Sequence, residues 1–315
     1  MKPIIEDRKF EGTHDYVFWN GKFFDSMHIS DPDLHVHWSI AKTTRLEAEP
    51  LEHAFTPDKG VIATHISQVN RLFRRLKSKN GPYNVVLYSR DGGIQAQKDE
   101  TNHKSYKTKN GYIITYKADL STSEYAMDHE TLNRIPKCVN KVFCSNVDVI
   151  DEKLVCFPYG VDARIAEVIK GVAKSEDYLY NRRELCYANF NPKTNRDYRI
   201  PVWEKMQSLD WVDCKENLSV FDYVIDLFSY KYTICPKGNG IDTMRMWESI
   251  YCGAIPIVNR SVVSSCFSSL LPIVEVDDWD LDKDYLESIY PALSQRLYNF
   301  SLVDRNYWSK LINEL

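Results

Sequence analysis

The chain has 315 residues, of which 43% are hydrophobic and 27% are charged, and its formal net charge at neutral pH is −4. This balance is typical of a globular protein with one large domain or two ordinary ones, and it excludes a largely disordered chain. Because a slightly acidic chain presents no basic field, we expect no nucleic-acid partner.

The first half of the chain alternates apolar strands with helical or polar segments. Residues 67–81 carry an amphipathic, basic pattern that predicts a helix, whereas residues 93–111 are polar and predict a long loop. Strands are predicted over residues 14–24, 60–66, 83–88, 111–119, 141–146 and 153–162. These strands are too continuously apolar to keep one face in water, which predicts a parallel α/β arrangement.

The second half repeats the pattern. Helices are predicted over residues 198–209, with an early interruption at Pro201, over 223–230, and near the end of the chain. Strands are predicted over residues 184–191, 231–236, 254–259 and 271–279.

The two sets of elements predict two Rossmann-like domains that face a cleft. Pro158 and Gly160 punctuate the change between the sets, so we place the domains at residues 1–157 and 158–315. The final helix, about residues 303–315, is a candidate to pack back on the first domain.

Eight cysteines are spread along the chain without a Cys-x-x-Cys pair or a Cys/His cluster of zinc-binding spacing. Several lie inside apolar runs, as Cys156 and Cys252 do, so we expect reduced thiols in a reducing compartment. No apolar segment approaches the length of a membrane span. We therefore expect a cytoplasmic protein without a membrane span.

Residues 235–259 carry the most informative pattern, in which a strand, a glycine loop, a helix and a second strand follow one another. Gly238 and Gly240 permit close approach of the backbone to a ligand, and Asp242 is a suitable N-cap for the helix. Gly253 is suited to the position after the helix C-cap. In open α/β sheets such a loop lies at the carboxyl ends of the strands, where the helix N-terminus suits a phosphate.

Arg245 and Glu248 lie three residues apart and therefore share one face of this helix. One interpretation is an intrahelical ion pair, which contributes a few tenths of a kcal/mol. The other places both side chains in a cleft, where an arginine offers a planar fork to a diphosphate and a glutamate accepts the hydroxyls of a ribose. The spacing alone leaves both interpretations open.

The same stretch resembles the nucleotide-sugar motif of the exostosin-like glycosyltransferases, which are inverting enzymes with a GT-B fold. The matching residues are Pro236, Gly238, Asn239, Gly240, Asp242, Arg245, Trp247, Glu248, Gly253, Ile255, Pro256 and Val258. Residues 187–199, 142–162 and 271–280 also look like segments of that family, so the resemblance spans roughly residues 81–290. The first eighty residues carry little of it, and we expect acceptor specificity there.

The resemblance implies a UDP-sugar donor, such as UDP-xylose, UDP-galactose or UDP-glucuronate, and a glycan hydroxyl as acceptor. It implies that Glu248 holds the ribose and that Arg245 and Arg199 hold the diphosphate. The remaining donor-binding residues that it implies are Asn189, Thr194, Asn195, Asn239, Gly240, Gly238, Asp242 and Tyr159.

An inverting transfer also requires a general base for the acceptor hydroxyl. Asp91 follows the buried strand and precedes two glycines, so we assign it this role, with His14, Asp15 and His65 as rivals. The alternative is a turn aspartate, which is common before glycine.

We expect no metal or other cofactor, because arginines and a helix N-terminus can neutralise a diphosphate. The two Asp-x-Asp triplets, at residues 31–33 and 278–280, are of a kind that arises by chance in an acidic chain. Anchored members of the family begin with a membrane helix, which this sequence lacks, so we expect a cytoplasmic microbial or viral protein.

Three alternatives remain, two of them from other classes. A nucleotide-sugar-binding module without turnover would keep Arg245 and Glu248 but lack a base. A fucosyltransferase-like enzyme would use a GDP-sugar. A nucleotide-dependent epimerase would carry a Gly-x-Gly-x-x-Gly motif near its N-terminus, which is absent from the sequence.

Overall fold

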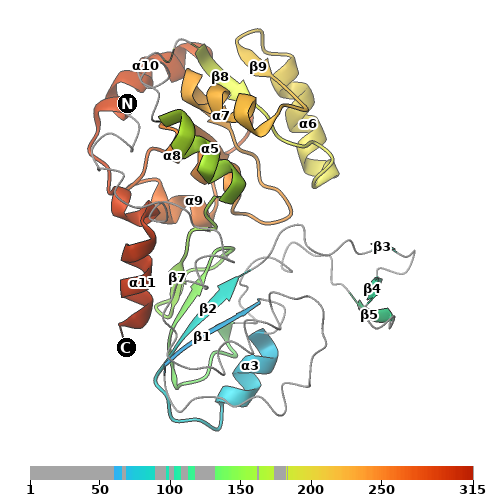
Figure 1. Ribbon diagram of the computed structural model, residues 1–315, viewed down its shortest axis with the longest axis vertical. Helices are drawn as coiled ribbons and strands as arrows, with labels where there is room; N and C mark the ends of the chain where they lie inside the picture. Colours follow the sequence, from blue (N-terminus) through green and yellow to red (C-terminus); the bar gives the residue numbers. More distant parts are fainter. Residues whose placement is uncertain are drawn as a thin grey trace. The chain divides into compact units, whose positions relative to one another are not determined.

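The computed structural model describes residues 60–65, 69–88, 97–98, 103–107, 113–117, 132–161, 163–173, 182 and 184–314. These residues fall into two compact units (Figure 1). One unit consists of Pro158–Tyr307, and the other consists of the described residues before Pro158 together with those from Trp308 onward.

The first unit is built on a sheet of four parallel strands in the order β1-β2-β6-β7. The strands are β1 (Gly60–His65), β2 (Tyr83–Tyr88), β6 (Val139–Cys144) and β7 (Leu154–Cys156). Tyr83 to Leu87 are all buried, as the continuous apolar run predicts for a central parallel strand. Helix α3 (Val69–Leu76) connects β1 to β2 and buries Val69, Leu72, Phe73 and Leu76, a helical spacing that confirms the amphipathic interpretation.

Helix α11 (Arg305–Asn313) reaches the first unit from the far end of the chain. The ring of Trp308 packs edge-on against Phe157 with 5.3 Å between ring centroids. The buried side chain of Asn84 in β2 donates from Nδ2 to the carbonyls of Ile312 at 2.7 Å and Glu314 at 2.9 Å. A strand residue thus supplies partners for carbonyls at the helix C-terminus, which have none within the helix.

Residues 93–111 are not one long loop, contrary to the prediction. They contain β3 (Gln97–Lys98) and β4 (His103–Lys107), which pair antiparallel with each other, and β4 pairs with β5 (Ile113–Lys117). The sequence of β4 is polar, so hydrophobic periodicity gives no signal for it. Its strand conformation follows from backbone pairing with β5, whose β-branched residues favour an extended chain.

The second unit is built on five parallel strands in the order β12-β11-β10-β8-β9. The strands are β8 (Glu184–Ala188), β9 (Val212–Cys214), β10 (Tyr230–Ile234), β11 (Ile255–Asn259) and β12 (Val274–Val276). In chain order the sheet reads 2-1-3-4-5, which is the flavodoxin-like form of the doubly wound fold. The strand order therefore reverses between β8 and β10.

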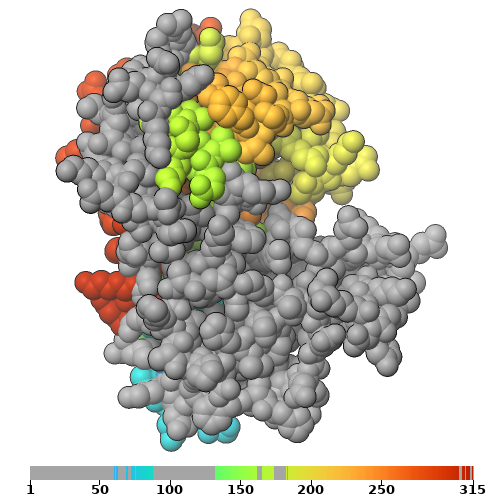
Figure 2. Space-filling view, in the orientation of Figure 1, coloured from blue at the N-terminus to red at the C-terminus, as the bar shows by residue number. Residues whose placement is uncertain are grey.

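Helices cover both faces of this sheet. They are α5 (Ala163–Ala173), α6 (Arg196–Gln207), α7 (Val220–Ser229), α8 (Met244–Tyr251), α9 (Val262–Phe267), α10 (Lys283–Gln295) and the 3₁₀ helix η4 (Phe300–Val303). On one face, α6 and α10 pack into a buried cluster that includes Trp203, Tyr232 and Leu286. On the other, α5 packs against α7 and α8, and Figure 2 shows α5 and α7 side by side. The predicted α/β class with parallel sheets is confirmed.

Helix α6 continues through Pro201, contrary to the predicted interruption. An internal proline removes one backbone hydrogen bond and costs about 3 kcal/mol in a helix interior. The side of α6 that carries Val202, Trp203 and Met206 is buried. Burial of side chains of this size contributes about 1.5–3 kcal/mol each, which offsets the proline.

Gly253 ends α8 as predicted. Its φ of 77° lies in the left-handed region, its N–H donates to the carbonyl of Ile250 at 3.0 Å, and Ala254 N–H donates to Ser249 at 2.9 Å. This pair of bonds is the Schellman motif. It turns the chain directly from α8 into β11.

Candidate functional site

The candidate site lies where the strand order of the second sheet reverses. The segment after β8 contains Asn189, Thr194 and Asn195, and the segment after β10 contains the glycine loop and Asp242. Both segments leave the carboxyl ends of neighbouring strands. In doubly wound sheets this is the crevice in which ligands bind, and the sequence motif accordingly lies at the switch point.

The glycine loop is tied to the segment after β8. The Nδ2 group of Asn195 donates to the carbonyl of Gly238 at 2.8 Å, and Gly238 N–H donates to the carbonyl of Gly240 at 3.1 Å. A Cβ at position 238 would lie 3.1 Å from Nη2 of Arg199 and 3.9 Å from Cγ2 of Thr194. A side chain at position 238 would therefore crowd the Arg199 guanidinium.

Arg199 is buried beneath this loop with 7% of its surface exposed. Its Nε donates to the carbonyl of Lys237 at 2.9 Å, Nη2 to Pro236 at 2.9 Å and Nη1 to Asn191 at 3.3 Å. The guanidinium also lies over the ring of Phe190, 5.6 Å from its centroid. These contacts make Arg199 a residue that positions the loop. Its contact with a diphosphate stays a prediction.

Asp242 is not the N-cap of α8, contrary to the prediction; the N-cap is Thr243. The Asp242 carboxylate is buried and accepts from the indole N–H of Trp247 and the backbone N–H of Tyr159, both at 2.8 Å. Burial raises its pKa to about 8, although these hydrogen bonds oppose the shift. Tyr159 itself is buried, and this backbone contact is the way in which it joins the site.

Arg245 and Glu248 lie on the side of α8 that faces Tyr223 of α7. Glu248 is 3% exposed, and its Oε2 accepts the Tyr223 hydroxyl at 2.6 Å. The Arg245 guanidinium lies 5.3 Å from the centroid of the Tyr223 ring, and its Nη2 reaches Oδ1 of Asn189 at 3.4 Å. The two charges predicted to share a face are thus joined through a tyrosine that the sequence interpretation did not include.

The electrostatics of this cluster favour a charged arginine. Burial lowers the pKa of Arg245, but the Tyr223 phenol and the Glu248 carboxylate outweigh burial and leave the pKa above its ordinary value. Burial also raises the pKa of Tyr223 well above its usual range. Within the described residues, the Nε atom of Arg245 is buried without a hydrogen-bond partner. A buried donor without a partner is uncommon and requires an explanation; among the described residues, the Nε of Arg182 is in the same state.

The remaining predicted residues are placed as follows. Asn239 is exposed at the tip of the loop, Gly240 is half-buried, and Thr194 donates its N–H to the carbonyl of Asn191 at 3.2 Å. Asp91 and its rivals His14 and Asp15 lie outside the described residues, as does the Asp-x-Asp triplet at 31–33. His65 is the last residue of β1, at the carboxyl edge of the first sheet.

The Asp-x-Asp triplet at residues 278–280 has structural contacts. Asp278 accepts the backbone N–H of Asp280 at 2.9 Å, and Asp280 forms an ion pair of 2.6 Å with Lys205. Trp279 between them is buried in the core cluster. Among the residues with a described position, no group of three or more His, Cys, Asp or Glu side chains is placed to hold a metal ion.

Two further expectations concern the whole chain. All eight cysteines are free thiols, as expected from their spacing. Of the helices that the structure describes, none is both long and apolar enough to cross a membrane.

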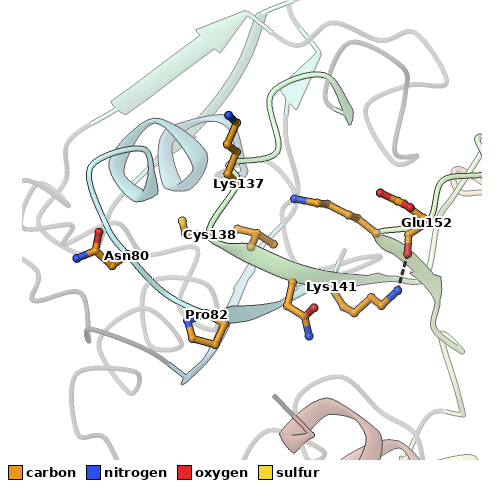
Figure 3. Close-up of a pocket in the computed structure, with 9 residues that line it drawn as sticks. Asn80, Pro82, Lys137, Cys138, Lys141 and Glu152 are labelled. Atoms are coloured by element: carbon orange, nitrogen blue, oxygen red, sulfur yellow. Dashed lines mark hydrogen bonds between the residues drawn. The ribbon is translucent and has the colours of Figure 1, made fainter.

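A pocket of about 460 Å³ lies in the first unit, at the amino ends of β2 and β6 (Figure 3). It is lined by Asn80, Pro82, Lys137, Cys138, Val139, Asn140, Lys141, Glu152 and Lys153. The ammonium of Lys141 donates to the carbonyl of Glu152, and that of Lys153 to the carbonyl of Pro136. Since this is the edge opposite the carboxyl ends, we do not assign the pocket to the candidate site.

Comparisons with known proteins leave the family open. No protein-family model and no curated protein matches the chain. Among the solved structures that match are the GtfA/B complex, with a TM-score of 0.36 and 10% identity, and the pneumococcal O-GlcNAc transferase GtfA in complex with UDP and GlcNAc, with a TM-score of 0.30 and 12% identity. The matches cover 87% and 81% of this chain but only 60% and 53% of those chains. At TM-scores this low, the likeness does not establish a shared fold or activity.

Proposed function

We propose that this protein is a glycosyltransferase that moves a sugar from a nucleoside diphosphate sugar to a glycan hydroxyl. The observation that carries the proposal is the half-buried Arg245, whose buried Nε has no partner among the described residues, at the switch point beside the N-terminus of α8. A diphosphate is a ligand with the charge and acceptor geometry that such a site requires.

The neighbouring residues fit a nucleotide. The glycine loop is held by Asn195 and Arg199 and presents its backbone at the carboxyl edge of the sheet. Glu248 has one carboxylate oxygen on Tyr223, and in our proposal the carboxylate also accepts a ribose hydroxyl. The resemblance of residues 235–259 to exostosin-like enzymes favours UDP and an inverting GT-B enzyme.

The chemistry of transfer would then proceed in one displacement. Asp91 takes the proton of the acceptor hydroxyl as its oxygen attacks the anomeric carbon, and the bond from that carbon to the diphosphate oxygen breaks. Arg245 and the N–H groups at the start of α8 neutralise the leaving diphosphate, so we propose that no metal is needed.

Nucleotide binding is the first test. Isothermal titration with UDP, GDP and ADP should give binding of UDP, and Arg245→Met should weaken it by about ten- to a hundredfold because a charged hydrogen bond is lost. Saturation at a hundredfold over the dissociation constant stabilises the fold by about 2.7 kcal/mol, so thermal unfolding provides a second readout. Absence of binding for all three nucleotides would refute the proposal.

Two alternatives are separated by the same assay and by turnover. Preference for GDP would indicate a fucosyltransferase-like enzyme. Binding of a UDP-sugar without hydrolysis or transfer to any glycan acceptor would indicate a binding module.

A further inference from the structure

A second hollow lies beside the glycine loop, at the carboxyl edge of the same sheet. Its volume is about 370 Å³. Four segments of the chain line it: Tyr198 comes from α6, Lys237 from the glycine loop, Asn259 from the end of β11, and Asp277 from the segment after β12. Met246 of α8 also lines it, and this residue is next in sequence to Arg245. The first turn of α8 therefore contributes Met246 to this pocket and Arg245 to the contact with Tyr223.

Tyr198 forms a fixed wall of the pocket. Its hydroxyl accepts the indole N–H of Trp279 at 3.0 Å and donates to Oδ1 of Asn259. The ammonium of Lys237 lies 4.6 Å from the centroid of the Tyr198 ring. Because a cation occupies this face of the ring, a nucleobase cannot stack on the same face.

The charged side chains that line the pocket are Lys237, Arg260 and Asp277, and the charge of Arg260 is compensated by carboxylates. Arg260 donates from Nε to Asp277 at 2.8 Å and from Nη1 to Glu275 at 3.4 Å. Glu275 in turn accepts the hydroxyls of Ser264 and Ser268. The guanidinium therefore already has two carboxylate partners, whereas Asp277 is 79% exposed and can accept further hydrogen bonds. An anionic ligand would compete with these carboxylates.

Amide and carboxylate oxygens around an apolar floor are suited to a ring that bears hydroxyl groups. We propose that this pocket receives the sugar of the donor, a neutral hexose or pentose, and that Asp277 accepts one of its hydroxyls. The inference rests on the proposed function. A diphosphate at the N-terminus of α8 would have its ribose on the side of Glu248 and its sugar on the side of Met246, with Lys237 within the loop that separates them.

The test compares the same variant with a nucleotide that has the sugar and one that lacks it. The probes are UDP and UDP-galactose, measured by isothermal titration against the parent and Asp277→Asn. We expect the variant to bind UDP-galactose roughly tenfold more weakly, as the loss of one hydrogen bond to a charged group implies, and to bind UDP within about twofold of the parent. Asp278→Asn is the matched control, because Asp278 is the adjacent acidic residue and does not line the pocket; it should change neither affinity.

The possible results separate the sugar pocket from the proposed function. Equal weakening of UDP and UDP-galactose, or no change in either, would overturn the sugar pocket while leaving the proposed function intact. Binding of neither probe, nor of GDP and GDP-mannose, by the parent would overturn both. Tighter binding of UDP-glucuronate than of UDP-galactose would contradict the neutral sugar. Thermal unfolding of Asp277→Asn within a few degrees of the parent shows that the variant is folded.

Discussion

The pair Glu248 and Tyr223 allows a structural role and a ligand-binding role to be separated by experiment. The Tyr223 hydroxyl donates to Oε2 of Glu248 at 2.6 Å, and both side chains are buried. A hydrogen bond to a charged acceptor contributes about 1.5–3 kcal/mol. Tyr223→Phe should therefore lower the free energy of unfolding by that amount and the Tm by roughly 2–4 °C for each kcal/mol.

The same reasoning predicts a different result for the carboxylate. Tyr223→Phe leaves the charge of Glu248 in place, so UDP affinity should stay within about threefold of the parent. Glu248→Gln keeps the shape but removes the charged acceptor for a ribose hydroxyl, so UDP should bind about ten- to a hundredfold more weakly. The affinities are measured by isothermal titration and the stabilities by urea unfolding. If Glu248→Gln loses stability while its UDP affinity equals that of the parent, Glu248 only holds α7 to α8.

Four further predictions follow from the described contacts and the proposed mechanism. Arg199→Met should lower the free energy of unfolding by roughly 2–4 kcal/mol because carbonyls of the loop lose their donors; Arg199→Lys should not restore it, and full rescue in urea unfolding would contradict the positioning role. Asp91→Asn should keep UDP affinity but lose transfer by about a hundred- to ten-thousandfold; turnover within a few-fold of the parent would refute the base. Activity should survive a chelator, and strict dependence on manganese or magnesium in the transfer assay would refute a metal-independent mechanism. The pKa of Asp242 is raised to about 8 in the folded state, so between about pH 4 and 8 the folded state binds a proton that the unfolded state has lost. The stability that this proton contributes is therefore lost as the pH rises from about 4 to 8, with a slope of at most about 1.4 kcal/mol per pH unit. Asp242→Asn should remove this pH dependence of the free energy of unfolding, and an unchanged slope in urea unfolding would contradict the pKa shift.

Hydrophobic patterning predicted the elements that are buried on a regular face. The central strand β2 was predictable from its nearly continuous apolar run, and the helix α3 from its helical apolar spacing. The end of α8 was predictable because glycine adopts the positive φ found at Gly253 without steric cost. In these cases the residues that determine the element lie within the element or next to it in the sequence.

Apart from α5, the elements that the sequence did not predict are either defined by pairing with a distant segment or too short to show a periodic pattern. The polar strand β4 is defined by its pairing with β5, and β9 and α9 are too short to show a period. Helix α5 was not predicted, although Ile165, Val168, Ile169 and Val172 have helical spacing that would have revealed it.

The candidate site was predicted in its location but not in all of its contacts. Residues 235–259 lie at the switch point because the motif follows a parallel strand. Asp242, however, accepts from Tyr159, which lies 83 residues away, and Arg199, which was expected to hold a diphosphate, donates to carbonyls of the loop. Backbone carbonyls are present at every residue, so the sequence does not show which of them accept hydrogen bonds from a side chain. The spacing of a buried arginine therefore does not reveal whether it contacts a ligand or the carbonyls of a loop.

The return of α11 has a consequence for synthesis on the ribosome. The first unit needs residues from both sides of Pro158–Tyr307, so its strands emerge well before the helix that completes them. At roughly 5–20 residues per second, synthesis of the intervening unit takes on the order of 10–30 s. During that interval the amide of Asn84 lacks the carbonyls of Ile312 and Glu314, and Phe157 lacks Trp308. All of Pro158–Tyr307 is therefore synthesised before the first unit has its last helix.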